Sequence, residues 1–301
     1  MTFMGRGGRR GGPVACALAV LMLTGCSQPV PVETSQVSRD AVVDLMNRDP
    51  EVGAAINVLT SECALKYGWT HGVHLQHGGG PSSVTGVPDV WRSSKEAERW
   101  GYSSAADDDT PRPQMSESQE KSIMGFSSSG PSQDDEPKTK VALPGGAVVS
   151  TASTGCHAEA QKKVYGSLED ALRLTNFINE VLPSGQKDLS KYEKVLRKAA
   201  PEYQKCMSEA GFDIKFGQAR DWAEKNVSPK RKPGERPAGR ELELARADGG
   251  CQEKVGLAQK LDEAYFEVAG AWVRDNEKRI LGLREKKQAA LERARTVLGS
   301  R

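Results

Sequence analysis

The sequence predicts a mainly α-helical fold, in which disulfide bonds join helical hairpins, with a long C-terminal helix and a large disordered insertion. Three observations support this prediction. Outside residues 78–150, apolar residues recur at the three- and four-residue spacing of helices. Neither alternating strand patterns nor strand–helix–strand spacing is found. Four of the six cysteines lie in the regions with helical spacing or directly beside them.

The first 25 residues have the three zones of a secretory signal peptide. Three arginines begin it without any acidic residue, a ten-residue apolar run from Val14 to Leu23 follows, and small residues end it. This run is too short to span a bilayer, which takes about 20 residues. We therefore predict that the chain is exported and that residues 1–25 are removed.

The four residues Leu23-Thr24-Gly25-Cys26 resemble the lipobox of bacterial lipoproteins. The resemblance implies that Cys26 receives a diacylglyceryl group and becomes the first residue of the mature chain. Two acyl chains anchor a protein stably, whereas a single chain binds only marginally. We expect a lipid-anchored protein on the extracytoplasmic face of the cell membrane, with residues 26–38 as a polar tether.

The charge balance argues against a nucleic-acid partner. Cleavage would remove three of the 42 basic residues and no acidic residue, which leaves 39 basic residues against 40 acidic ones. A dedicated nucleic-acid-binding protein would carry a strongly basic face. Aromatic residues make up only 6% of the chain, so the core must rest on aliphatic residues and alanine.

A first helical half is expected over residues 39–183. The apolar spacing predicts helix over 39–67 and again over 156–182, where Pro183 would end it. Between them, residues 78–150 are expected to form a long and mostly disordered insertion, because glycine, serine and proline supply 30 of these 73 residues.

One part of the insertion is expected to be ordered. Residues 95–102 carry Trp100 and Tyr102, two of the few aromatic residues in this region. We predict a locally ordered island there.

A second helical half is expected over residues 184–301. Helix is predicted over 189–210, with Gly211 just past its end, where a glycine commonly terminates a helix. Residues 228–240 are rich in proline and basic residues and are expected to be a loop.

The longest helical region is predicted over 241–298. If residues 252–298 were continuous, they would span about 70 Å at 1.5 Å per residue. Gly270 and Gly282 are the positions where we expect such a helix to bend.

The cysteines occur in two matching contexts. Cys63 and Cys206 each begin the pattern Cys-x4-Gly-aromatic, and Cys156 and Cys251 each end the pattern Ala-x2-Gly-Cys. Four cysteines allow three connectivities, and spacing alone does not choose between them. The repeat favours Cys63–Cys156 and Cys206–Cys251, each joining the end of one helix to the start of the next.

The segments Cys206-Met-x3-Gly-Phe212 and Ala245-x-Ala-Asp-x2-Cys251, with the charged helix after them, are similar to segments of exported actinobacterial lipoproteins. The resemblance covers roughly residues 190–298 well and residues 50–165 loosely. In the first half Ala64 replaces the usual methionine, and the aspartate before Cys156 is missing. The resemblance supports export and the disulfide pairing, and it implies no activity.

His71, His74 and His77 form the cluster richest in metal-ligand chemistry. Three imidazoles could bind zinc or copper. If the segment were a helix, the three histidine side chains would not converge on one metal ion. The glycines that follow favour a loop, which would lack the rigid supporting contacts of a metal site. Solvated loop histidines are the alternative interpretation.

Two further features each allow two interpretations. The basic residues of the second loop could contact anionic lipid headgroups or wall polymers, or could simply be an exposed linker; they are Lys230, Arg231, Lys232, Arg236 and Arg240. An apolar stripe in the last helical region could bind a partner helix or pack into the core of the protein itself; it comprises Tyr265, Phe266, Val268 and Trp272.

No hydrolase elbow, phosphate-binding loop or dinucleotide glycine motif is present in the sequence. The sequence therefore predicts a non-enzymatic lipoprotein that binds another envelope protein or a cell-wall polymer, without a cofactor. The alternative prediction is a lipoprotein that binds zinc or copper through the three histidines.

Overall fold

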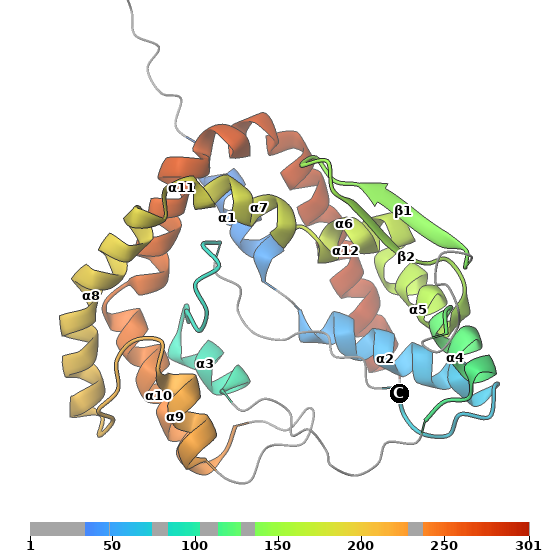
Figure 1. Ribbon diagram of the computed structural model, residues 1–301, viewed down its shortest axis with the longest axis horizontal. Coiled ribbons are helices and arrows are strands. Elements are labelled where there is room, and N and C mark those ends of the chain that lie inside the picture. The colour runs from blue at the N-terminus through green and yellow to red at the C-terminus, as the bar shows by residue number, and fades with distance from the viewer. Residues whose placement is uncertain are drawn as a thin grey trace, which may run out of the picture. The chain divides into compact units, whose positions relative to one another are not determined.

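The computed structural model describes residues 34–47, 49–73, 84–102, 114–127, 136–227 and 237–300. These residues form helices and one two-stranded sheet, which confirms the mainly helical fold class (Figure 1). The predicted signal peptide and Cys26 lie outside the described residues. Within the described part of the chain, no helix is both long and apolar enough to cross a membrane.

Two helices replace the single helix expected over 39–67: α1 (Gln36–Met46) and α2 (Pro50–Leu65). Asn47 leaves the helical conformation with ψ of 132°, and Pro50 starts α2, because a residue without an N–H suits the first turn. The prediction of a tether over 26–38 is wrong at its end, since α1 already begins at Gln36.

Ordered elements lie in the segment predicted to be a mostly disordered insertion. They are α3 (Ser94–Trp100), α4 (Glu117–Met124), β1 (Lys138–Ala142) and β2 (Val148–Ala152). The strands pair antiparallel, with Lys138 opposite Ala152 and Ala142 opposite Val148. The prediction of disorder over 78–150 is therefore wrong for the residues described there, whereas α3 confirms the ordered island. The two strands were not marked by any alternating pattern in the sequence.

Three short helices replace the single helix predicted over 156–182: α5 (Gly155–Tyr165), α6 (Leu168–Thr175) and α7 (Ile178–Gly185). Gly166 ends α5 with φ of 94°, and the Ser167 hydroxyl then caps α6 by accepting the Asp170 N–H. Pro183 lies inside α7 and does not end a helix before it.

The rest of the chain forms a short 3₁₀ turn, η2 (Gln186–Asp188), followed by α8 (Leu189–Glu209), α9 (Ala219–Asn226), α10 (Gly239–Lys254), α11 (Leu257–Asp275) and α12 (Glu277–Gly299). Gly211 follows α8 with φ of 85°, as predicted. The continuous helix expected after residue 241 is wrong. It breaks at Gly256, with φ of 62°, and at Asn276, and not at Gly270 or Gly282.

The structure confirms the predicted disulfide pairing, with Cα–Cα distances of 5.5 Å for Cys63–Cys156 and 5.7 Å for Cys206–Cys251. The first bridge joins the last turn of α2 to the first turn of α5, as expected. The second joins the last turn of α8 to the last turn of α10, so the expectation that Cys251 begins a helix is wrong.

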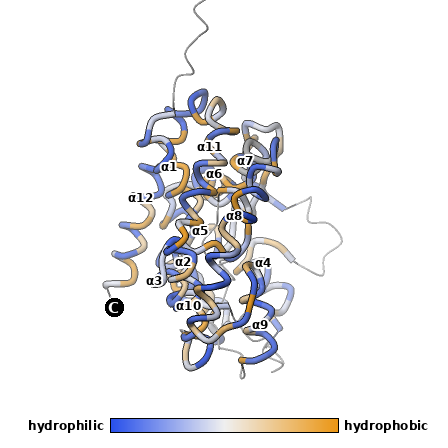
Figure 2. The backbone as a smooth tube through the Cα atoms, turned by 90° about the vertical axis from the view of Figure 1, so that its left-hand side faces the viewer, coloured by the Kyte–Doolittle hydropathy of each residue, from blue (hydrophilic) through white to orange (hydrophobic). Residues whose placement is uncertain are grey.

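Elements of the two predicted halves pack against one another. The C-terminal part of α12 packs on α2 and α5, and Leu291 and Ala294 share a buried hydrophobic cluster with Val52 and Ile56. Likewise, α3 of the first predicted half packs against α10 of the second. Figure 2 shows hydrophilic and hydrophobic stretches alternating along α12, as expected of a helix with one face in the core.

Three of the four residues of the apolar stripe in α11 belong to the main hydrophobic core, which is separate from the cluster between α12, α2 and α5. Tyr265 and Phe266 are buried, and Trp272 packs against the main hydrophobic cluster. The Tyr265 hydroxyl donates to the Val181 carbonyl oxygen over 3.2 Å. The stripe thus stabilises the protein's own fold.

Candidate functional site

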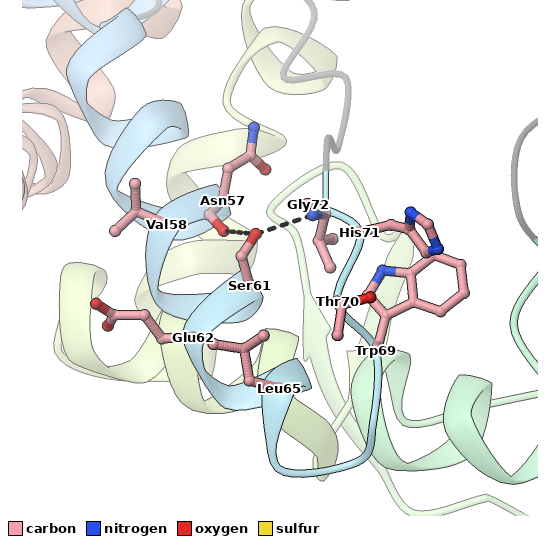
Figure 3. Close-up of a pocket in the computed structure, with 10 residues that line it drawn as sticks. Asn57, Val58, Ser61, Glu62, Leu65, Trp69, Thr70, His71 and Gly72 are labelled. Atoms are coloured by element: carbon pink, nitrogen blue, oxygen red, sulfur yellow. Dashed lines mark hydrogen bonds between the residues drawn. The ribbon is translucent and has the colours of Figure 1, made fainter.

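A pocket opens between α2 and the extended segment Trp69–Val73 that follows it (Figure 3). Its cavity volume is about 240 Å³. One wall is formed by α2 residues from Asn57 to Leu65, and the other wall by Trp69–Val73. The lining is mostly apolar, and the Leu65 side chain at the end of α2 is 58% exposed.

The second wall is held in place by hydrogen bonds and by the core. The Ser61 hydroxyl donates to the Asn57 carbonyl oxygen over 2.8 Å and accepts the Val73 N–H over 2.8 Å (Figure 3). The Trp69 side chain is buried in a small cluster that also contains Cys156 of the first disulfide. The pocket is therefore a formed feature of the fold, and the first disulfide belongs to the hydrophobic cluster that holds the Trp69 wall.

The chain turns sharply to build this wall. Gly68 has φ of 74°, in the left-handed region that glycine tolerates, and the Trp69 N–H donates to the Ala64 carbonyl oxygen over 3.2 Å. The Cys-x4-Gly-aromatic pattern found in the sequence thus encodes this turn. The same pattern at Gly211 and Phe212 ends α8.

The chemistry of the pocket suits binding. Ser61 uses its hydroxyl both as donor and as acceptor, so it is committed to the wall. The Trp69 indole N–H is buried and has no hydrogen-bond partner among the described residues. Ligand pockets usually measure about 300–1,000 Å³, so this cavity suits a side chain of a partner better than a cofactor.

His71 lies at the rim of the pocket, and its ring is 5.2 Å from the Trp69 ring in an edge-on contact. The other two histidines of the predicted metal cluster, His74 and His77, lie outside the described residues. Across the described ranges, no group of three histidine, cysteine, aspartate or glutamate residues could hold a metal ion.

A second polar centre surrounds Asp248, which is 1% exposed. One carboxylate oxygen accepts the Trp91 indole N–H over 3.0 Å and the Tyr102 hydroxyl. The other accepts the Tyr203 hydroxyl over 2.6 Å and the Gln252 amide over 3.0 Å. This centre fastens the segment before and after α3 to α8 and α10.

Burial governs the protonation of this centre. Burial raises the pKa of Asp248, and the hydrogen bonds that it accepts act in the opposite direction. Burial and the nearby Asp248 carboxylate raise the pKa of Tyr203 and of Tyr102, so both hydroxyls stay protonated donors. Because the carboxylate is enclosed and fully engaged, we interpret the centre as structural.

Sequence reasoning did not identify this centre, although one signal was present. Asp248 is the aspartate of the Ala-x-Ala-Asp-x2-Cys segment, three residues before Cys251. Its partners Trp91 and Tyr102 come from the segment predicted to be mostly disordered. Their separation in sequence from Asp248, by 157 and 146 residues, hid the connection.

Ion pairs support the same segment. The Arg220 guanidinium contacts the Asp89 carboxylate at 2.6 Å and donates to the Tyr102 carbonyl oxygen over 2.9 Å. Asp89 has φ of 54°, an uncommon value for a residue other than glycine, and its carbonyl oxygen accepts the Gln252 amide over 2.9 Å. The surrounding contacts thus hold an unfavourable backbone conformation in place.

Of the basic residues predicted in the second loop, Arg240 is described and the other four lie outside the described residues. The Arg240 guanidinium lies 4.6 Å from the centre of the Phe212 ring and 2.8 Å from the Glu243 carboxylate. Arg240 therefore has partners within the protein.

No protein-family model matches the chain, and no curated protein and no solved structure is found to match it. The fold and the site define a mainly helical protein with two disulfides and an apolar surface pocket.

Proposed function

We propose that the protein is an exported lipoprotein, anchored through Cys26 to the extracytoplasmic face of the cell membrane, which binds another envelope protein without catalysing a reaction. The lipobox-like residues Leu23 to Cys26 motivate the anchor. The two disulfides support export, because such bonds persist in oxidising compartments and are rare in the cytosol.

The observation that carries the binding role is the pocket beside α2. It combines an apolar lining, an exposed leucine at its rim and an unpartnered indole N–H. A buried donor without a partner costs about 1–3 kcal/mol, which an oxygen acceptor of a partner could recover after a small movement. We infer that the partner offers an apolar side chain next to a carbonyl group. A peptide segment of another protein has both, and a wall glycan lacks the apolar side chain.

Photo-crosslinking in intact cells tests this proposal. A photoreactive amino acid replaces Leu65 at the rim, and in a matched variant it replaces Val148, which is 65% exposed on the β-hairpin. We expect one reproducible protein adduct from position 65 and none of that mass from position 148. Equal adducts from both positions, or none from position 65, would contradict the binding role assigned to the pocket.

Metal binding remains the second proposal, because His71 is exposed at the rim of the same pocket. If it is right, calorimetry with zinc or copper should show micromolar or tighter binding. That binding should disappear when all three histidines are replaced by alanine. Binding that survives the triple substitution would reject this site.

A further inference from the structure

The chain enters the folded part at a fixed point. Thr34 is buried, and its hydroxyl donates to the Gly270 carbonyl oxygen over 3.2 Å. The Ser35 hydroxyl donates to the Glu277 carboxylate over 2.9 Å, and the Arg39 guanidinium donates to the Thr34 carbonyl oxygen over 3.2 Å. The chain is thus fastened where α11 ends and α12 begins; we call this region the entry corner.

Little chain separates the entry corner from the proposed lipid. Thr34 is eight residues after Cys26. A fully extended chain spans at most about 3.3–3.6 Å per residue, so these residues reach about 28 Å at most. Whatever their conformation, a lipid on Cys26 would keep the entry corner within that distance of the membrane surface.

Exposed apolar side chains lie beside the entry corner. Val37, in the first turn of α1, is 58% exposed, and Leu189, the first residue of α8, is 53% exposed. The start of α8 lies beside α11 (Figure 1), and an ion pair of 2.6 Å joins Lys191 of α8 to Glu267 of α11, three residues before Gly270. Both side chains are more than half exposed.

The pocket lies at the other end of α12. This helix starts in the entry corner at Glu277 and has 23 residues, about 34 Å at 1.5 Å per residue. Val297 and Leu298 in its last turns pack against the same hydrophobic cluster as Leu59 of α2, which lies one turn before the pocket residue Glu62. The length of α12 thus separates the pocket from the point where the chain enters.

We propose that the entry corner, with Val37 and Leu189, rests on the phospholipid surface and that α12 holds the pocket away from it. This orientation rests on the proposed function, because it requires the lipid on Cys26. The partner of this surface is the phospholipid headgroup layer, and the pocket is left open to a protein that approaches from outside the membrane.

Energy transfer to labelled lipids tests the orientation. The full lipidated chain, checked by its mass, is placed in vesicles of phosphatidylethanolamine and phosphatidylglycerol that contain a headgroup-labelled acceptor lipid. A fluorescent amino acid replaces Val37 or Leu189 near the corner, and Leu65 or Tyr67 near the pocket. Leu65 matches Val37 in exposure, at 58%, and Tyr67, at 46%, is close to Leu189. We expect several-fold stronger transfer from positions 37 and 189.

The outcomes separate the two proposals. Transfer from positions 65 and 67 that equals or exceeds transfer from 37 and 189, in a chain that carries the lipid, overturns the orientation and leaves the anchor intact. A Cys26→Ser chain should show no transfer from any position. If it binds the vesicles as the parent does, or if the parent carries no lipid, both proposals fail.

Discussion

Gly249 and Gly250 are neighbours in α10, and the fold predicts opposite effects for the same substitution at the two positions. A Cβ added at Gly249 would lie 2.7 Å from the Ala97 Cβ and 2.9 Å from the Ser94 Cα, both in α3. At Gly250 an added Cβ meets nothing within 4 Å among the described residues. The two helices therefore approach one another through Gly249.

The magnitudes follow from these contacts. Alanine is favoured over glycine inside a helix by about 0.8–1 kcal/mol, so Gly250→Ala should raise the free energy of unfolding by up to that amount. At Gly249 the same gain is opposed by overpacking against backbone and Cβ atoms, which typically costs about 1–3 kcal/mol. Since both of those atoms are rigidly placed, we expect Gly249→Ala to lower stability by about 1–2 kcal/mol.

Urea unfolding of a soluble chain with Cys26→Ser, without reductant, measures both values. The two variants carry the same substitution at neighbouring positions of one helix, so their difference reports the contact of Gly249 with α3. If both variants shift the urea midpoint in the same direction, the close packing of α3 on α10 is wrong.

Three further predictions concern stability, each measured by the same urea unfolding. Replacing both cysteines of the Cys63–Cys156 bridge by serine should cost about 2–5 kcal/mol. Removing the Cys206–Cys251 bridge should cost about 0.6 kcal/mol less in the chain-entropy account, because it joins residues 45 apart in sequence and the first bridge joins residues 93 apart. A smaller loss of stability from removing the first bridge would argue against that account. Lys287→Met removes hydrogen bonds to the carbonyl oxygens of Asp44 and Asn47 at the end of α1 and should cost about 1.5–3 kcal/mol, whereas the half-exposed Lys286→Met should cost under about 1 kcal/mol; equal losses would refute the role of Lys287. Burial raises the pKa of Asp248 above its ordinary value of 3.8, so the folded state binds this proton more tightly than the unfolded chain does. The free energy of unfolding should therefore fall as the pH rises from 3.8 through the raised pKa. Asp248→Asn should remove this part of the slope, and an unchanged slope would contradict the assignment.

The helices and the disulfide pairing could be predicted because short sequence patterns mark both, although the paired cysteines lie 93 and 45 residues apart. Apolar spacing located the helical regions, and the two repeated cysteine contexts favoured the pairing that the structure has. The breaks were harder to place. Gly270 and Gly282 continue their helices, while Gly256 adopts φ of 62° and ends one, a difference that composition does not reveal.

The segment around α3 could not be predicted because distant residues stabilise it. Its glycine and serine content is typical of disordered chain. Serine also caps helices, however, and the Ser93 hydroxyl accepts the Glu96 N–H at the start of α3. The Trp91 indole and the Tyr102 hydroxyl then donate to the Asp248 carboxylate, 157 and 146 residues further along the chain. An argument from amino-acid composition predicts neither the capping hydrogen bond nor the two long-range hydrogen bonds to Asp248.

The sequence indicated only part of the pocket. The Cys-x4-Gly-aromatic pattern marks the turn that builds its wall, and His71 lies in the cluster singled out from the sequence. The role of Ser61 could not be foreseen, because its hydrogen bond to Val73 depends on how the chain folds back after Gly68.

Mass spectrometry of the protein isolated from cell membranes, digested without reduction, tests the proposal of an exported lipoprotein most directly. We expect an N-terminal peptide that begins at Cys26 and carries a diacylglyceryl group, together with peptides linked through Cys63–Cys156 and Cys206–Cys251. A peptide that contains unmodified Cys26 joined to the residues before it, with free thiols at Cys63, Cys156, Cys206 and Cys251, would contradict the account.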